Sequence, residues 1–104
     1  MQRSPDESAK QASPATNWWV YMIRCDDDSL YTGVSTDPGR RFQEHLQAPQ
    51  GAKYFNGRKP LCIVYTESGH TRSSACQREA AIKQLGRHQK LQLVAAYQAP
   101  NGAD

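Results

Sequence analysis

The stretch LYTGVSTDPGRRFQEH, residues 30–45, contains a strand, a turn and the beginning of a helix. Residues 30–35 are mostly aromatic, β-branched or aliphatic, which is typical of a strand. Asp37 and Pro38 follow, and these residue types favour the N-cap and the first position of a helix. The stretch therefore predicts a strand that leads through a short turn into a helix.

The predicted helix has distinct faces. Phe42 and Leu46 form its apolar stripe, and at 100° per residue Arg41 and His45 project side by side at one edge of that stripe. Arg40 points nearly opposite Phe42, into solvent. Two adjacent arginines thus have different expected surroundings, and only Arg41 is expected to face the rest of the domain.

Upstream, WWVYMIRC at 18–25 is a second strand, and the acidic turn at 26–28 favours a hairpin between the two strands. A turn centred on Asp27 places Tyr21 opposite Gly33. Because side chains alternate along a strand, Tyr21, Tyr31 and Gly33 then share one face.

Further elements follow downstream. LCIVYTE at 61–67 predicts a third strand, and Ser74 with Gln77 forms a capping-box pattern before a helix at 75–86. A short last helix is expected over 88–97. The order of elements predicts an α+β domain with a three-stranded, mostly antiparallel sheet flanked by helices.

With 104 residues the chain fits one domain. We expect a disordered N-terminal tail at 1–16, a folded domain at 17–98 and a C-terminal tail at 99–104, because both ends are polar and rich in Ser, Pro, Gly, Gln and Ala. No apolar segment resembles a secretory signal or a membrane span. Three widely spaced cysteines argue for reduced thiols and a cytoplasmic location.

The charge is unevenly distributed. Between 38 and 98 the chain has ten Lys or Arg residues and three acids, a balance of +7, although the whole chain is only +3. Such a positive lobe suits a polyanion such as nucleic acid, and a solvated basic surface is the alternative. The residues we expect to bind nucleic acid are Lys53, Tyr54, Arg58, Lys59, Arg40 and Lys83.

Glu79 lies beside the apolar stripe of the predicted helix at 75–86, where a carboxylate must be hydrated, paired or metal-bound. One interpretation is an i,i+4 ion pair with Lys83. The other is a divalent-metal site, since Mg²⁺ is often held by one carboxylate together with waters and phosphate.

Arg41 and His45 are open to two interpretations as well. Arg41 could simply pair with Glu44, or it could stabilise charge on a phosphate while His45 moves a proton. Tyr21 and Tyr31 are either half-buried sheet aromatics or acid–base groups. A glycine inside a strand, such as Gly33, usually marks a bulge or a close approach.

Taken together, these residues resemble the GIY-YIG nuclease family. Trp19-Val20-Tyr21 is similar to its first motif and Tyr31-Thr32-Gly33 to its second; an arginine and a histidine follow at eight and twelve residues past that glycine, and a helical glutamate comes later. The similarity covers about 18–94 and is greatest to small stand-alone bacterial members, which share patterns such as LYTG, RR-x-x-x-H and E-x-x-IKQL.

The resemblance implies a nuclease that hydrolyses phosphodiester bonds with one Mg²⁺ or Mn²⁺ ion. Its catalytic residues would be Tyr21, Tyr31, Arg41, His45 and Glu79: Glu79 holds the metal, Arg41 stabilises the transferring phosphate and Tyr21 is a candidate general base. Tyr31 and His45 would shape the site and position water or protons, and Gly33 would leave room for them.

We therefore expect a DNA endonuclease, with DNA more probable as substrate than RNA and a connection to repair as one option. Trp19 stands where the family name has glycine, and the helix of Glu79 is followed by no asparagine before Asn101. The alternative is thus a nucleic-acid-binding accessory module of the same fold with little or no cleavage, and a third option is a protein-interaction adaptor. No membrane partner is expected, and a monomer is one option for the oligomeric state.

Overall fold

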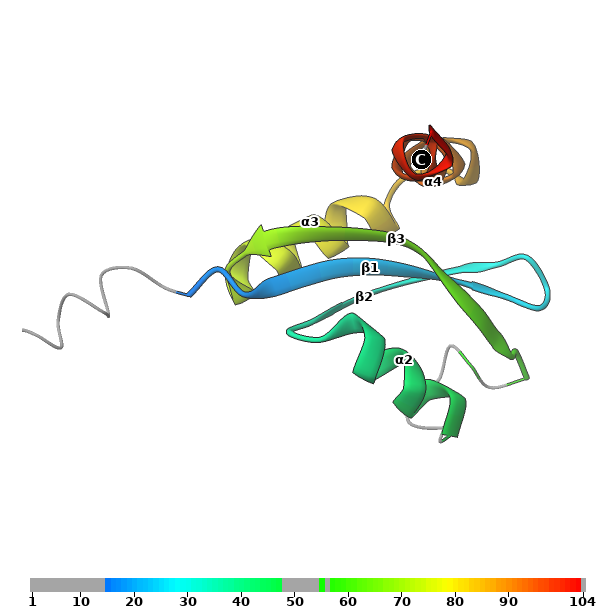
Figure 1. The fold of residues 1–104 in the computed structure, drawn as a ribbon, viewed down its shortest axis with the longest axis horizontal. Coiled ribbons are helices and arrows are strands. Elements are labelled where there is room, and N and C mark those ends of the chain that lie inside the picture. The colour runs from blue at the N-terminus through cyan, green and yellow to red at the C-terminus, as the bar shows by residue number, and fades with distance from the viewer. Residues whose placement is uncertain (1–14, 48–54, 56, 104) are drawn as a thin grey trace, which may run out of the picture.

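The fold comes from a computed structural model, which describes residues 15–47, 55 and 57–103. The tail expected at 1–16 therefore lies almost wholly outside the described residues. The elements are β1 (Trp18–Cys25), β2 (Leu30–Ser35), α2 (Pro38–Gln47), β3 (Pro60–His70), α3 (Arg72–Lys83) and α4 (Arg87–Ala103). This order confirms the predicted α+β fold (Figure 1).

The three strands form one antiparallel sheet in the order β2-β1-β3, so β1 is central. Tyr21 pairs with Gly33 across the hairpin, which confirms the predicted register. The turn contains Asp28 in the left-handed region at φ 67°, a conformation that aspartate adopts more readily than most residues. The hairpin therefore fixes which side chains of β1 and β2 share a face.

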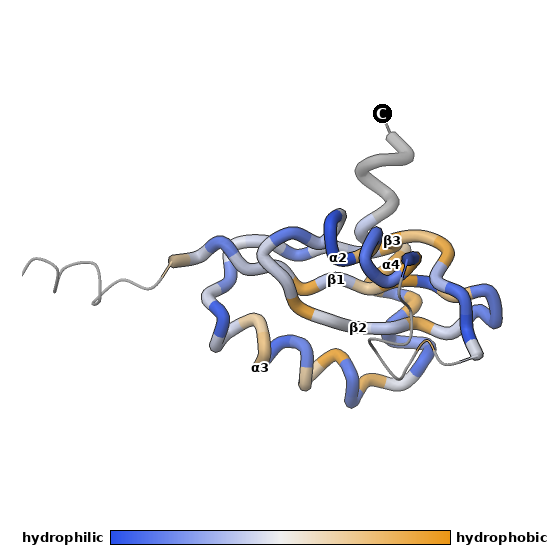
Figure 2. The backbone as a smooth tube through the Cα atoms, turned by 90° about the horizontal axis from the view of Figure 1, so that it is seen from below, coloured by the Kyte–Doolittle hydropathy of each residue, from blue (hydrophilic) through white to orange (hydrophobic). Residues whose placement is uncertain are grey.

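Helices cover the two faces of the sheet differently. In Figure 1, α2 lies on one side of the strands, while α3 and α4 lie on the other. The face under α3 and α4 is an aliphatic core with partly buried residues of α4 packed against it. Its fully or largely buried members are Val20, Met22, Leu30, Val64, Tyr65, Ala75 and Ile82. Along α3, hydrophobic and hydrophilic residues alternate, as expected for a helix with one packed side (Figure 2).

The face under α2 has a second, more aromatic cluster. Its buried members are Tyr21, Ile23, Cys25 and Phe55, with Tyr31, Phe42 and Ile63 packed against them. The prediction that Leu46 belongs to the packed stripe of α2 is wrong, because Leu46 is 39% exposed while His45 is 1% exposed. His45 thus lies at the centre of the packed face of α2 and not at its edge.

The start of α3 also differs from the prediction. The helix runs from Arg72 to Lys83 instead of 75–86, because Thr71 and not Ser74 is its N-cap. The Thr71 hydroxyl accepts a hydrogen bond from the Ser74 N–H, and the Ser74 hydroxyl accepts one from the Thr71 N–H, each at 3.0 Å. This reciprocal capping box satisfies two N–H groups that the first turn would otherwise leave unpaired.

Two elements, β3 and α4, are longer than predicted. β3 runs over Pro60–His70 instead of 61–67. α4 runs to Ala103, past the predicted end at 97, so most of the tail expected at 99–104 is helical and that boundary is corrected. The polar composition and the proline of these last residues had indicated an irregular segment. No helix of the described residues is long and apolar enough to cross a membrane.

Candidate active site at the edge strand

Gly33 allows a close approach of two tyrosine rings. A Cβ atom added at Gly33 would lie 2.7 Å from the hydroxyl oxygen of Tyr21 and 3.0 Å from a ring carbon of Tyr31. Carbon atoms of side chains essentially never come this close to other heavy atoms. The close approach predicted at this glycine is therefore present, and the approaching groups are the tyrosines of β1 and β2.

The imidazole of His45 extends from α2 into this tyrosine pair. Its Nε2 lies 3.5 Å from the Tyr21 hydroxyl oxygen, and its ring meets the Tyr31 ring edge-on at 5.5 Å between centroids. Phe55 closes the cluster, with its ring centroid 4.6 Å from that of His45 and 4.8 Å from that of Tyr31. The helix and the hairpin thus bring together residues that are 24 positions apart in sequence.

Phe55 is a member of this cluster that the sequence argument did not select. It is 2% exposed, although it lies in a segment otherwise rich in Gly, Pro and basic residues. The sequence feature that indicates its burial is an aromatic residue in an otherwise polar segment, since such a residue usually packs against the nearest core. Its neighbour Tyr54, predicted to bind nucleic acid, lies outside the described residues.

Burial changes the acid–base properties of this cluster. Desolvation raises the pKa of Tyr21 well above its usual value, and Tyr31 raises it further, whereas the nearby Arg41 guanidinium opposes the rise. Burial, followed by the positive charge of Arg41, lowers the pKa of His45. At neutral pH the site therefore holds an un-ionised phenol beside a neutral imidazole, a pair that can exchange a proton.

Arg41 and Arg40 have the different surroundings that the helix geometry predicts. Arg41 is half-buried beside Tyr21, and its Nη1 donates to Oε1 of Glu44 at 2.9 Å. The local ion pair considered for Arg41 is thus formed, with side chains 41% and 47% exposed. Arg40 is exposed, and its backbone N–H donates to the Asp37 carboxylate, which confirms Asp37 as the N-cap.

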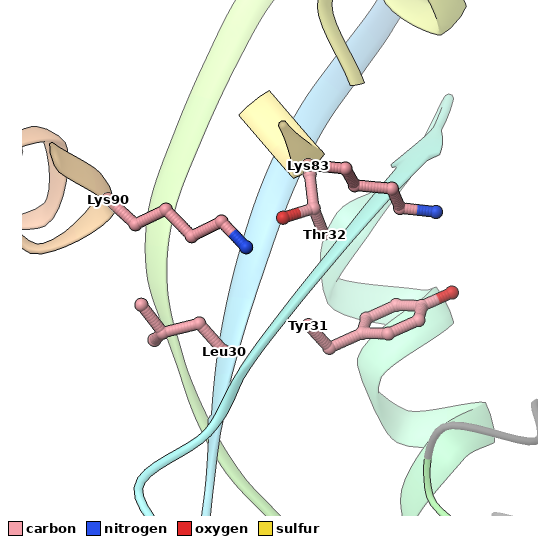
Figure 3. Close-up of a pocket in the computed structure, with 5 residues that line it drawn as sticks. All are labelled: Leu30, Tyr31, Thr32, Lys83 and Lys90. Atoms are coloured by element: carbon pink, nitrogen blue, oxygen red, sulfur yellow. The ribbon is translucent and has the colours of Figure 1, made fainter. Parts of the chain in front are cut away.

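Glu79 lies on α3 and is linked to the edge strand β2 through Lys83. Its carboxylate pairs with the Lys83 ammonium at 3.1 Å and is 23% exposed. Lys83 in turn lines a cavity together with Tyr31, and in Figure 3 its ammonium and the Tyr31 hydroxyl point to the same side of β2. The i,i+4 pair is therefore formed, and β2 is contacted by both α2 and α3.

Two other basic residues of the predicted nucleic-acid-binding set, Arg58 and Lys59, lie at the hairpin turn. Arg58 Nε donates to Asp27 at 2.8 Å, and the backbone N–H of Lys59 donates to Asp26 at 3.1 Å. These bonds tie the chain before β3 to the acidic turn. Lys53 lies outside the described residues, so nucleic-acid contacts by these groups stay a prediction.

A divalent ion at this site would depend on Glu79. Within the described part of the chain, no group of three or more His, Cys, Asp or Glu residues is arranged to hold a metal ion. An ion at Glu79 would have one protein carboxylate, displacing Lys83, and would take its remaining ligands from water and phosphate. Mg²⁺ accepts this arrangement, so the residues fit a single hard cation.

The aromatic cluster thus lies beside a strand glycine, with an arginine on the adjoining helix α2, and the glutamate of α3 is paired with a lysine beside β2. A family model described as the GIY-YIG catalytic domain matches residues 17–92. The chain belongs to the GIY-YIG family. The GIY-YIG domain points to a nuclease superfamily, and membership implies binding to nucleic acid.

Several proteins are similar to this chain over most of its length. The UPF0213 protein DP2720 of Desulfotalea psychrophila is 46% identical over 79 residues, which are 76% of this chain and 72% of that protein. The solution structure of the UPF0213 protein BH0048 from Bacillus halodurans is 38% identical with a TM-score of 0.52, covering 81% of this chain and 88% of that one. The protein EF2693 from E. faecalis is 36% identical with a TM-score of 0.54, covering 82% and 90%.

Proposed function

We propose that this protein is an endonuclease that hydrolyses phosphodiester bonds in DNA with one Mg²⁺ or Mn²⁺ ion. The observation that supports this most is the convergence of Tyr21, Tyr31, His45 and Arg41 at β2, with the Glu79–Lys83 pair of α3 at the same strand. A scissile phosphate at this edge would meet a cation, a proton acceptor and a carboxylate at once.

Arg41 is the group that we assign to the phosphate. Its planar guanidinium matches the oxygens of a phosphodiester, and charge builds on these oxygens as water attacks phosphorus. The exposed Glu44 carboxylate that now pairs with Arg41 would be replaced by the phosphate. Because that pair is half-exposed, exchanging it for a dianionic transition state requires little rearrangement.

Tyr21 and His45 are the groups that we assign to the proton. Attack by water forms a P–O bond and breaks the bond between phosphorus and the leaving oxygen, so the attacking water must lose a proton. The neutral His45 imidazole, 3.5 Å from the Tyr21 hydroxyl, can accept a proton directly or through Tyr21. The raised pKa of Tyr21 means that its phenol stays protonated until such a transfer occurs.

Glu79 would hold the divalent ion, which supplies positive charge at the phosphate and lowers the pKa of a bound water. Lys83 covers this carboxylate in the free protein. The same lysine, once released, adds a positive charge beside Tyr31.

Cleavage of labelled single-stranded, duplex and branched DNA, and of RNA, with and without Mg²⁺ or Mn²⁺ tests the proposal. We expect metal-dependent products from the wild type, and a loss of at least about 100-fold in Glu79→Gln and Arg41→Ala. Arg40→Ala is the matched control, since it removes the same charge from the exposed side of α2 and should weaken binding only in a salt-sensitive way. Identical products from the wild type and Glu79→Gln would reject the enzyme proposal.

A second candidate, a nucleic-acid-binding module without cleavage, is favoured by one observation. Both charged groups assigned to catalysis are already paired, Glu79 with Lys83 and Arg41 with Glu44. If DNA binds but no metal or substrate yields products, this candidate replaces the first.

A further inference from the structure

A cavity of about 260 Å³ lies along the edge strand β2, next to the tyrosine and histidine cluster. Its walls are Leu30, Tyr31 and Thr32 from β2, Lys83 from α3 and Lys90 from α4. Figure 3 shows that the two lysines approach the strand from different helices. Three separate elements therefore build the cavity.

Thr32 gives the cavity a polar group without a partner. The residue is 2% exposed, and its hydroxyl oxygen is the buried side-chain atom of the described residues that has no hydrogen-bond partner. Leaving a buried hydroxyl unpaired is costly, so such groups in native proteins usually serve a ligand or a water. In Figure 3 this hydroxyl is turned to the side from which the Lys90 side chain enters.

Lys90 gives the cavity a positive charge that is available. Among the described residues no hydrogen bond or ion pair engages its ammonium group, and the residue is only partly exposed. Lys83, by contrast, is already paired with Glu79 at 3.1 Å. An anion in the cavity would therefore meet a free ammonium group and a hydroxyl donor, while Lys83 forms the wall toward Glu79.

We infer that this cavity is a phosphate subsite, which holds a backbone phosphate of the bound strand next to the scissile one. The inference rests on the proposed function, because it takes the phosphate from the same nucleic acid. Lys90 would contribute a charge-assisted hydrogen bond and the Thr32 hydroxyl a second one. Leu30 would contact the sugar or base. The strand would pass over the edge of β2.

The test uses the full-length Glu79→Gln protein, which is not expected to cut, so binding is measured apart from cleavage. Inorganic phosphate, a 5′-mononucleotide and a short single-stranded oligonucleotide are titrated while the backbone amide signals are followed by NMR. We expect saturable shifts at Leu30, Thr32 and Lys90 with all three probes, at the lowest concentration with the oligonucleotide. If the oligonucleotide binds no better than phosphate, or if the shifts lie elsewhere, the inference is overturned.

Two variants separate a binding role from a structural one. Thr32→Val removes the hydroxyl at nearly constant shape, so it should raise the Tm while weakening oligonucleotide binding about 5-fold. Thr36→Val, at an exposed position just after β2, is its control. A higher Tm with unchanged affinity, or an unchanged Tm with lost affinity, would contradict the assignment.

Lys90→Gln should weaken oligonucleotide binding about 10-fold, because it removes a charge-assisted hydrogen bond. Arg24→Gln is the control for the loss of one positive charge, since Arg24 is half-exposed and pairs with Asp28 in the hairpin turn. Equal effects of the two substitutions would overturn the subsite. Absence of cleavage by the wild type, with the NMR shifts present, would reject the nuclease proposal and leave the phosphate site standing.

Discussion

The two faces of the small sheet bury different kinds of side chain. Under α3 and α4, aliphatic side chains such as Val20, Met22 and Ile82 pack to 0% exposure. Under α2, the buried residues include a tyrosine and a histidine, packed beside a glycine that holds them at close range. Burying polar rings stabilises a fold less than burying aliphatic groups does, so we expect the aliphatic core to provide most of the stability, while the polar groups under α2 are available for chemistry.

The largest expected effect on stability lies on the aliphatic face. Ile82→Ala leaves a cavity in a fully buried position, so we expect the free energy of unfolding to fall by about 3 kcal/mol, measured by urea denaturation. Cleavage per folded molecule should stay near that of the wild type. Leu91→Ala, at a position 42% exposed, is the control with little effect. A loss of cleavage greater than the unfolded fraction explains would show that the core under α3 and α4 also affects cleavage.

The second-largest expected effect on stability is at Gly33, on the face of the sheet under α2. In Gly33→Ala the new methyl group would lie 2.7 Å from the Tyr21 hydroxyl, and because Tyr21 is buried, its ring has little room to move. We expect a loss of about 2 kcal/mol in stability, by the cost of overpacking, and a loss of cleavage by about 100-fold. Gly86→Ala is the matched control, since a Cβ atom there meets nothing within 4 Å. Full cleavage by Gly33→Ala would show that the spacing of the tyrosines is not needed.

A smaller effect should appear as a pH dependence of stability. The pKa of His45 is lowered on folding from its usual 6.5, so the unfolded chain takes up a proton at a higher pH than the folded one does. Stability is then fully present above pH 6.5 and falls as the pH is lowered below this value, by at most about 1.4 kcal/mol per pH unit.

The lowered pKa values of Glu44 and Glu67 act only below 4.5, so unfolding is measured between pH 4.5 and 6.5. His45→Gln should flatten this slope, whereas His88→Gln, at an exposed position, should keep it. An unchanged slope in His45→Gln would contradict the assignment of a neutral buried imidazole.

The smallest effect on stability concerns the exposed pair of Arg41 and Glu44. Glu44→Gln should leave the Tm nearly unchanged, because ion pairs at such exposure contribute little. It should nevertheless raise oligonucleotide affinity about 2-fold, since it releases Arg41 for phosphate. Asp28→Asn removes the same charge from another exposed pair, with Arg24, and equal gains in both variants would show that only overall charge matters.

The hairpin could be predicted from sequence because its signals are local. The acidic turn and the strand patterns fix the pairing of Tyr21 with Gly33, and the Asp37-Pro38 pair fixes the start of α2. These features depend on neighbours within a few positions. The shared face of the two tyrosines follows from this pairing together with the alternation of side chains along β2.

The position of His45 could not be predicted in the same way. Hydropathy favours Leu46 for the packed side of α2, but the rings of Tyr31 and Phe55 surround the imidazole instead. Phe55 comes from a later segment, so no helix-based argument includes it. At α3, both Thr71 and Ser74 are residue types suited to a cap, and only the reciprocal hydrogen bonds identify the first.

β2 is an edge strand, hydrogen-bonded to β1 and on its other side to none of the strands in the described part of the chain. The free edge of such a strand can pair with a strand of a second polypeptide, which is a common route to aggregation. Lys83 and Lys90 flank it with charged side chains, which oppose association with another strand. The two lysines would thus act as gatekeepers that keep copies of the protein apart in concentrated solution, a role that persists when no nucleic acid is bound.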